Sequence, residues 1–310
     1  MKIVFMGTPD FAVGALDALV RAGYEVAAVV TQPDKPKGRG KGVQCPPVKE
    51  FALQHGIPVL QPVKIREPEM VAALSGYGAD LFVVAAFGQI LTQEILDMPR
   101  FGCVNIHASL LPKYRGAAPI QRAILDGESV TGVTLQQMNA GIDTGDILAK
   151  VRVDIAPEET GDSLFEKLMH AGAALLIETL PRIEAGKITP EAQDEAQATY
   201  AKRLSKELGQ IDWKESAEVI ERKIRAFHSW PGAYTTLSGK PFKLWGARSS
   251  DAPADGEAGS VSAVTKEEII VNCGEGRLVL TEVQLSGKKR MPVKDFLLGV
   301  KVQTGERLGE

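Results

Sequence analysis

The sequence predicts an α/β protein of two domains, in which a parallel sheet flanked by helices precedes a smaller all-β domain. The first observation is length: at about 100–200 residues per domain, a chain of 310 residues is expected to form two. In the first half of the chain, short apolar runs alternate with helical patterns, which favours a parallel sheet with crossover helices. In the last third, short β-like segments follow one another between turn residues.

Four short runs rich in β-branched residues have the pattern of strands buried on both faces of a sheet. They are Lys2–Met6, Val26–Val30, Leu81–Ala85 and Val104–His107. Apolar residues at helical spacing predict helices at Phe11–Arg21, Glu67–Leu74 and Ile120–Asp126. Two more strands and a long helix follow at Thr131–Met138, Ile147–Val153 and Ser163–Ile183. The expected fold is Rossmann-like, with ligands at the carboxyl ends of the strands.

The composition changes after residue 183. Residues 184–205 have few large apolar side chains and are interpreted as a linker between domains 1–183 and 206–310. In the second domain, a helix is expected at Ser216–Phe227. Five strands are expected at Tyr234–Leu237, Phe242–Ala247, Ser260–Val264, Glu268–Asn272 and Leu278–Gln284. Five strands in so short a segment suggest a small barrel or a sandwich. Because five is the strand number of an OB-like barrel, we predict an OB-like barrel.

Composition excludes several classes of protein. With 44% apolar and 24% charged residues, the chain is not disordered, and no apolar run approaches the roughly 18 residues of a membrane-spanning helix. The first residues read as a strand instead of a secretion signal. Cys45, Cys103 and Cys273 are far apart and form no cluster with the four histidines. We therefore expect no disulfide framework, no metal site and a cytoplasmic location.

The first strand runs into the turn Gly7–Phe11, which opens the first helix. A dinucleotide fingerprint would have glycines at positions 7, 9 and 12, but Pro9 and Ala12 stand at the last two. Side chains at these positions keep a pyrophosphate from the backbone, so binding of NAD is not expected. A tight turn and a helix start explain the motif.

The densest group of chemically useful residues lies at the end of the strand Val104–His107. Side chains two positions apart on a strand point to the same face, so Asn105 and His107 are expected side by side. An amide donor and an imidazole suit a developing oxyanion and a travelling proton. A single histidine after a strand is nevertheless more often structural than catalytic.

A second polar segment, Asn139–Asp146, is a turn-rich loop between two predicted strands. If this loop folds over the end of the earlier strand, Asp143 would orient His107 and favour its charged form. In the alternative interpretation, aspartate and glycine only form the turn of a polar hairpin. Spacing alone favours the alternative.

Taken together, these segments resemble the 10-formyltetrahydrofolate-dependent formyltransferases. The resemblance depends on Asn105-x-His107, Ser109–Gly116 and Asp143–Gly145. Further motifs resemble those of the members that act on initiator methionyl-tRNA, namely Gly7–Phe11, Thr31–Pro36, Gly116–Ile120 and Trp230–Ala233. The motifs extend over essentially the whole chain.

The resemblance implies that a formyl group moves from N10 of the folate to the α-amino group of methionine on the tRNA, giving N-formylmethionyl-tRNA for translation initiation. It places Asn105 and His107 at the oxyanion and pairs Asp143 with His107 to move the proton. It implies neither a metal nor a covalent intermediate. The first domain would bind the folate and catalyse the reaction, and the second would bind tRNA.

The resemblance also implies where the folate binds. The expected contacts are Ser109, Leu110, Leu111 and Pro112, with Phe87, Ile90 and Leu91 as an apolar wall for the pterin. The Leu111–Pro112 bond is expected to be cis. Core packing is the alternative role of Ile90 and Leu91. Phe11 is expected beside the methionyl side chain.

Since the net charge is −3, binding of tRNA has to depend on local basic patches. One is the glycine-rich segment 34–43, with Lys35, Lys37, Arg39 and Lys41. Flexible cationic segments commonly become ordered on RNA, and in the resembling family this segment reaches the acceptor stem, with Arg39 as the expected contact. The second patch is Lys288, Lys289 and Arg290. A solvated loop and a charged surface turn are the respective alternatives.

Three other functions stay open at this point. A folate-dependent formyltransferase that acts on a small amine would share the three catalytic residues, and so would a hydrolase that releases formate. A non-enzymatic RNA-binding protein would use the first domain only as a scaffold. The basic segment and the second domain favour tRNA, because a small substrate needs neither. We expect a monomer.

Overall fold

The computed structural model describes residues 1–36, 43–250 and 252–310. Lys37, Arg39 and Lys41 of the expected tRNA contacts lie outside the described residues. Contacts divide the chain into two units that are discontinuous in sequence. The N-terminal unit comprises Met1–Pro119, Val130–Asp154 and Phe165–Ala201, and the C-terminal unit comprises Ile120–Ser129, Ile155–Leu164 and Lys202–Glu310. The linear boundaries at 183 and 206 stay a prediction.

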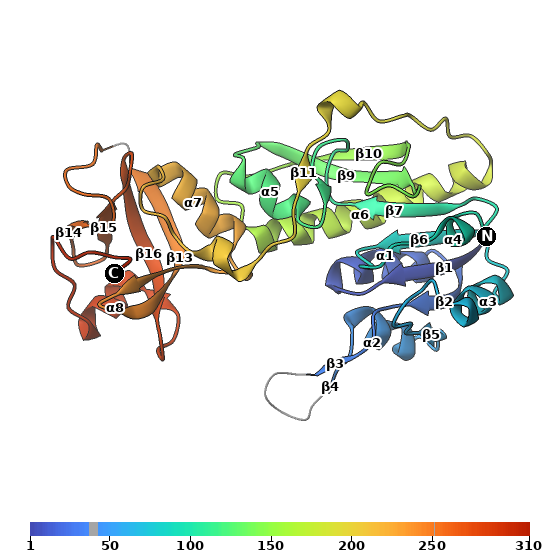
Figure 1. Ribbon diagram of the computed structural model, residues 1–310, viewed down its shortest axis with the longest axis horizontal. Coiled ribbons are helices and arrows are strands. Elements are labelled where there is room, and N and C mark those ends of the chain that lie inside the picture. The colour runs from blue at the N-terminus through green and yellow to red at the C-terminus, as the bar shows by residue number, and fades with distance from the viewer. Residues whose placement is uncertain (37–42, 251) are drawn as a thin grey trace. The chain divides into compact units, whose positions relative to one another are not determined.

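The N-terminal unit is built on a seven-stranded sheet of order β10-β9-β7-β6-β1-β2-β5 (Figure 1). Five strands are parallel: β1 (Lys2–Gly7), β2 (Glu25–Val30), β5 (Val59–Leu60), β6 (Leu81–Ala85) and β7 (Cys103–His107). The hairpin of β9 (Val130–Gln137) and β10 (Ile147–Asp154) adds antiparallel strands beside β7. The parallel sheet expected from the buried apolar runs is therefore present and is extended by an antiparallel hairpin.

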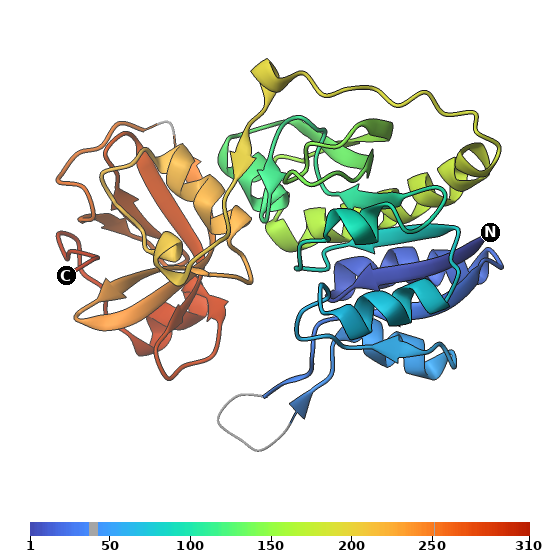
Figure 2. The same ribbon diagram turned by 45° about the vertical axis from the view of Figure 1, so that its right-hand side comes forward.

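Helices cover both faces of this sheet, which Figure 2 shows after a rotation. They are α1 (Asp10–Arg21), α2 (Pro47–Gln54), α3 (Pro68–Gly76), α4 (Gln93–Leu96) and α6 (Gly161–Glu184). The helix α5 (Pro119–Leu125) lies, except for its first residue, in the C-terminal unit. Val4 and Met6 of β1 share one core cluster with residues of α3 and α4 and with Cys103 of β7. Gly172 of α6 lies against Ile106 of β7. Because side chains alternate, Asn105 and His107 share the face of Cys103, opposite to α6.

The loops at the carboxyl ends of the parallel strands are bonded to one another. The carbonyl of Phe87 accepts from Thr8 Oγ1 and from Gln32 Nε2, both at 3.2 Å. Gly7 permits the close turn out of β1, since a Cβ there would lie 2.5 Å from that of Ala12 and 2.9 Å from the carbonyl of Ala85. These hydrogen bonds tie together the loops that follow β1, β2 and β6.

The segment expected as a linker is bonded to the N-terminal unit. It contains the short helix η1 (Glu195–Gln197) and β11 (Tyr200–Ala201), which pairs in parallel with β8 (Arg115–Gly116). Glu191 also forms a bridge with Ile147 at the start of β10. Few large apolar residues are present, so backbone hydrogen bonds hold this segment in place. The short strands β3 (Lys35–Pro36) and β4 (Val43–Gln44) pair with each other.

The C-terminal unit is an antiparallel sheet of order β12-β13-β16-β15-β14, with β17 beside β16. Its strands are β12 (Ala233–Leu237), β13 (Lys240–Ser250), β14 (Val261–Val264), β15 (Ile269–Asn272), β16 (Arg277–Leu285) and β17 (Met291–Pro292). The helices are η2 (Lys206–Gly209), α7 (Ala217–Ala226) and α8 (Val293–Gly299). Bridges join Leu308 to Leu237 of β12 and Arg307 to Ser260, which precedes β14. Residues 307–308 thus connect both edges of the sheet, as closure of a small barrel requires.

No helix within the described ranges combines the length and the apolar character that crossing a membrane requires.

Candidate active site

Asn105, His107 and Asp143 come together at the carboxyl end of β7. Asn105 Nδ2 donates to Asp143 Oδ1 at 3.3 Å, and His107 Nδ1 lies 3.6 Å from the same oxygen. The antiparallel register places Asn105 opposite Gln136 of β9 and His107 opposite Thr134. The β9–β10 loop therefore returns over the end of β7, the arrangement in which Asp143 orients the imidazole.

Neutral donors surround the Asp143 carboxylate. Gln136 Nε2 donates to Oδ1 at 2.8 Å, and the backbone N–H of Gly116 donates to Oδ2 at 2.9 Å. Together with Asn105, they direct three hydrogen bonds at one carboxylate. The side chain is only 16% exposed, so these donors replace the water that would otherwise solvate its oxygens.

The loop around Asp143 is held in an unusual backbone conformation. Asp143 has a φ of 53°, in the left-handed region. Asn139 Oδ1 accepts from the N–H of Gly141 at 3.0 Å and from Thr144 Oγ1 at 2.7 Å, which closes the turn. Gly145 lies against the backbone of Gln137, where a Cβ would collide. The turn residues noted in the sequence therefore shape the loop that carries the carboxylate.

The proton position on His107 follows from the hydrogen bond of its other ring nitrogen, Nε2. Nε2 lies 2.9 Å from the carbonyl oxygen of Tyr114, which can only accept, so Nε2 carries a proton. In the neutral ring, Nδ1 then presents a lone pair to Asp143. A proton gained at Nδ1 would lie between imidazole and carboxylate, and Nδ1 is therefore the atom that can take up and release one.

The segment Ser109–Pro112, expected at the folate, is a loop held by β9. Thr134 Oγ1 donates to the carbonyl of Ser109 at 2.7 Å and accepts from the N–H of Leu111 at 3.0 Å. Ser109 is buried and donates to the carbonyl of Lys113 at 2.6 Å. The Leu111–Pro112 bond is cis, as expected. Leu111 is buried, whereas Leu110 and Pro112 are partly exposed.

The other residues expected near the substrates differ in exposure. Phe87 and Leu91 are buried in the sheet core, whereas Ile90 is 76% exposed. Phe11 is also buried, and its ring contacts that of Phe165 edge to face at 5.6 Å. Core packing thus accounts for the phenylalanines and for Leu91, and only Ile90 presents an open apolar surface.

The basic residues that were expected to contact tRNA, and that the structure describes, differ in whether they are bonded to other side chains. Lys35 is exposed on β3. Lys288 and Lys289 are exposed on the turn after β16. Arg290 is bonded to Glu282 and lies over the ring of Trp245, with Cζ 4.5 Å from the centroid. Its guanidinium is therefore engaged within the unit, unlike the two exposed lysines beside it.

Sequence reasoning missed Gln136, Arg115 and Gln193. Gln136 and Thr134 are polar residues two positions apart in β9, a spacing that could have placed them on one face. Arg115 is completely buried and bonded to Gln193 and Glu195. No local pattern marks Gln193, because its partners are distant in sequence.

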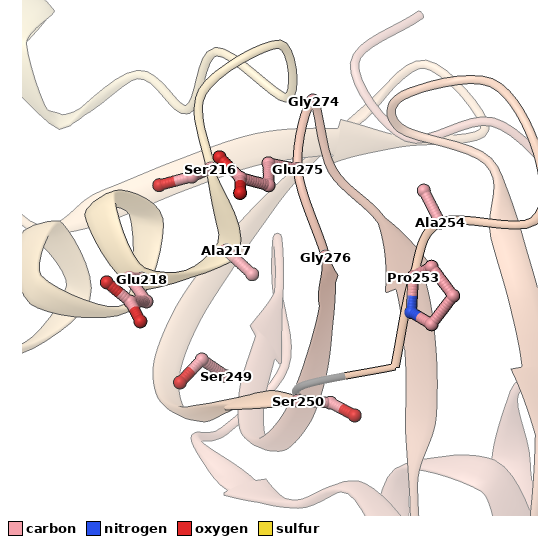
Figure 3. A pocket seen from close by; sticks show the side chains of 10 residues that line it. All are labelled: Ser216, Ala217, Glu218, Ser249, Ser250, Pro253, Ala254, Gly274, Glu275 and Gly276. Carbon is pink, nitrogen blue, oxygen red and sulfur yellow. The ribbon is translucent and has the colours of Figure 1, made fainter.

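A cavity of about 540 Å³ lies in the C-terminal unit (Figure 3). Side chains of Ser216, Glu218, Ser249, Ser250 and Glu275 line it, together with small residues. None of the residues expected at the active site contributes to it. Among the described residues, no three His, Cys, Asp or Glu side chains are grouped as a metal site would require.

Similar proteins identify the family of this chain. Residues 1–180 match the formyl transferase family, and residues 203–301 match the C-terminal domain of formyl transferases. A methionyl-tRNA formyltransferase of Agathobacter rectalis is 55% identical over 305 residues, which are 98% of each chain. That of Bacillus subtilis is 51% identical over 309 residues, with 99% of this chain and 98% of the relative covered.

Solved structures share the fold at low sequence identity. WlaRD, a sugar 3N-formyl transferase, superimposes with a TM-score of 0.68 at 20% identity and covers 93% of this chain and 99% of its own. HypX from Aquifex aeolicus in complex with tetrahydrofolic acid has a TM-score of 0.65 at 21% identity, over 98% of this chain and 48% of its own. The chain therefore belongs to the formyl transferase family, among the methionyl-tRNA formyltransferases.

Proposed function

We propose that this protein transfers the formyl group of 10-formyltetrahydrofolate to the α-amino group of methionyl initiator tRNA, giving N-formylmethionyl-tRNA for translation initiation. Identities of 55% and 51% over nearly the full length to relatives named for methionyl-tRNA support this substrate. The observation that carries the chemistry is the convergence of Asn105 and His107 on the carboxylate of Asp143.

The reaction requires one charge to be stabilised and one proton to be moved. The neutral amine attacks the formyl carbon, a carbon–nitrogen bond forms, and the carbonyl oxygen becomes an oxyanion. The bond from that carbon to N10 of the folate then breaks, and N10 receives the proton that the amine loses. A donor to the oxyanion and a group that relays the proton are therefore the two catalytic elements needed.

Asn105 is the donor we assign to the oxyanion. Its carboxamide has two N–H bonds, of which one is directed at Asp143 Oδ1. The other is assigned to the substrate oxygen, and Asp143 fixes the plane of the amide. One preorganised donor of this kind contributes about 10²–10³-fold to kcat.

His107 and Asp143 are the proton relay in this proposal. Nε2 is held by the Tyr114 carbonyl, so the proton from the amine enters at Nδ1, where Asp143 stabilises the resulting imidazolium. The same nitrogen then returns the proton toward N10. Positioned proton transfer is typically worth about 10²–10⁴-fold.

The folate is assigned to the loop Ser109–Pro112. Partly exposed Leu110 and Pro112 and the exposed Ile90 are the surfaces offered to the pterin, while Ser109 and Leu111 shape the loop from inside. Phe87 and Leu91 would support Ile90 from the core, and Phe11 would support the methionyl site in the same indirect way.

The tRNA is assigned to the basic residues. Lys35 and the exposed pair Lys288 and Lys289 are available for phosphates, and Arg39 remains the expected contact in the glycine-rich segment. We place the enzyme in the cytoplasm and expect it to act as a monomer.

One assay separates this function from its alternatives. The purified chain is incubated with 10-formyltetrahydrofolate and initiator Met-tRNA, deacylated tRNA, small amines or no acceptor. We expect N-formylmethionyl-tRNA only in the first reaction. Formylation of a small amine at an equal or higher rate would assign a different acceptor. Release of formate without an acceptor would indicate a hydrolase, and RNA binding without any turnover would leave only a binding protein.

A further inference from the structure

Gln193 bridges the loop of Asp143 and the buried Arg115. Its Nε2 donates to the backbone carbonyl of Asp143 at 2.8 Å and to that of Gly145 at 2.7 Å. Its Oε1 accepts from Arg115 Nε at 3.1 Å and from Nη2 at 2.8 Å. One side chain therefore satisfies two carbonyl acceptors and two guanidinium donors.

The chemistry of these partners allows only one orientation of the amide. Backbone carbonyls can only accept and a guanidinium can only donate, so NH₂ has to face the loop and the oxygen has to face Arg115. A carboxylate at this position would place an oxygen against two carbonyl oxygens, and an apolar side chain would satisfy neither set. The site is specific for a carboxamide.

Arg115 is itself held firmly. Its side chain is completely buried and forms a bidentate pair with Glu195, with Nη1–Oε2 at 2.9 Å and Nη2–Oε1 at 2.7 Å. The hydrogen bonds that Arg115 donates to Glu195 raise the pKa of Arg115 further, so the guanidinium is always a cation. Gln193 is thus anchored on a group that can neither move into solvent nor change charge.

The loop that Gln193 holds needs such support. Asp143 has a φ of 53°, a conformation that costs a non-glycine residue energy and persists where neighbours enforce it. The two carbonyls bound by Gln193 flank Thr144, so the amide clamps the turn immediately after Asp143. The direction of the carboxylate toward His107 follows from this backbone conformation.

We propose that Gln193 is a positioning residue, which keeps the Asp143 carboxylate aligned with His107 by clamping the backbone of the catalytic loop to Arg115. This inference rests on the proposed function, since Asp143 has to be catalytic for its alignment to matter. Gln193 does not touch the reacting groups and acts only through Asp143.

The test compares Gln193→Met and Gln193→Glu in the full chain with the control Gln197→Met. Gln197 is exposed, and its amide is bonded to Asp194 within the same segment. With Met-tRNA and 10-formyltetrahydrofolate, we expect kcat of both Gln193 variants to fall about 10²-fold, as misplacement by about an ångström produces. The KM values for Met-tRNA and for 10-formyltetrahydrofolate should each change less than about threefold, because the residues assigned to bind the two substrates are unchanged. The control should match the wild type.

Two further measurements separate alignment from mere folding. The pH profile of kcat should shift in Gln193→Met, because the neighbour of His107 has moved, whereas loss of folded protein only scales the profile. In the background of Asp143→Asn, Gln193→Met should cost almost nothing more. If the losses of the two substitutions add in the double variant, this inference is wrong. It is also wrong if Gln193→Met keeps the wild-type kcat and pH profile while Asp143→Asn is inactive. Either result leaves the proposed function untouched. Full activity of Asp143→Asn would instead overturn the proton relay assigned to Asp143, and absence of formyl transfer in the wild type would overturn the proposed function.

Discussion

Asp143 combines a strained backbone with a well-satisfied carboxylate. Its φ of 53° is unfavourable for a residue with a side chain, yet three neutral donors meet its oxygens. Strain of this kind persists at sites where surrounding contacts determine the conformation. Neither the strain nor the donors can be inferred from the Asp-Thr-Gly triplet, which explains why spacing alone favoured a simple turn.

At His107 and Asp143, removal of either side chain should abolish the proton relay. We expect His107→Ala and Asp143→Ala to lower kcat by about 10²–10⁴-fold while the far-ultraviolet spectrum and the affinity for tRNA stay close to those of the wild type. Formyl transfer and filter binding of Met-tRNA measure the two properties. Activity in the double variant would refute the relay.

Gln136 should affect catalysis more than stability. Its amide donates to Asp143, but its Oε1 is buried without a hydrogen-bond partner among the described residues. Gln136→Leu removes the donor and the orphaned acceptor together, so kcat should fall about tenfold with a change in unfolding free energy of at most about 1 kcal/mol.

Gln137→Leu on the same strand is the matched control for that variant, because Gln137 bonds to the backbone of Phe101 and Cys103 instead of Asp143. Steady-state kinetics and urea unfolding provide the two readouts. If both variants lose activity equally, the donor to Asp143 is not what matters.

Among the elements, the strands were predicted best. Runs such as Leu81–Ala85 coincide with β6, and the alternation at β7 correctly placed Asn105 and His107 on one face. The helices α1 and α7 were also expected within a few residues. These predictions were correct for the same reason, because the spacing of apolar residues within a short segment of the sequence indicates both the type of element and its buried face.

Two of the strands that were missed depend on distant partners. β8 and β11 are two residues each and exist only because they pair with each other across the chain. The segment around Gln193 was interpreted as a linker because it lacks large apolar residues, whereas hydrogen bonds to Arg115, Asp143 and Gly145 hold it. Hydrogen bonds between remote residues leave no periodic signal in the sequence.

Burial within the strands also predicts thiol reactivity. Burial raises the pKa of Cys103 in β7 and of Cys273 after β15 to about 12 in each case. At pH 8 both thiols are therefore protonated and shielded, and neither is a nucleophile. We expect iodoacetamide to label only the partly exposed Cys45 in the native protein and all three after denaturation, as measured by mass spectrometry. Native labelling of Cys103 would show that the sheet opens.

On the scale of the whole molecule, charge has to act locally. The net charge is −3, so a polyanion such as tRNA is attracted by patches and not by the protein as a whole. Each unit has exposed basic residues of its own. Lys35 belongs to the N-terminal unit, and the exposed pair Lys288 and Lys289 belongs to the C-terminal unit.

Replacing the exposed lysines should weaken the use of tRNA in a salt-dependent way. For Lys288→Ala and Lys289→Ala, we expect a raised KM for Met-tRNA, an unchanged KM for the folate, and a salt slope smaller by about one per lysine. Lys266→Ala, on another exposed turn, is the control. Equal behaviour of all three variants over a salt series would mean that the pair is only a solvated turn.

The clamp at Gln193 has a practical consequence for dissecting this enzyme. A fragment ended where composition changes, at residue 183, would lack Gln193, Glu195 and the strand partner of β8. Extending the expressed fragment through Ala201 restores all of them and coincides with the last segment of the N-terminal unit. Residues 184–201 are eighteen residues with few large apolar side chains, so they are easily removed as a linker. Their presence would thus decide whether the expressed N-terminal fragment retains an ordered catalytic loop.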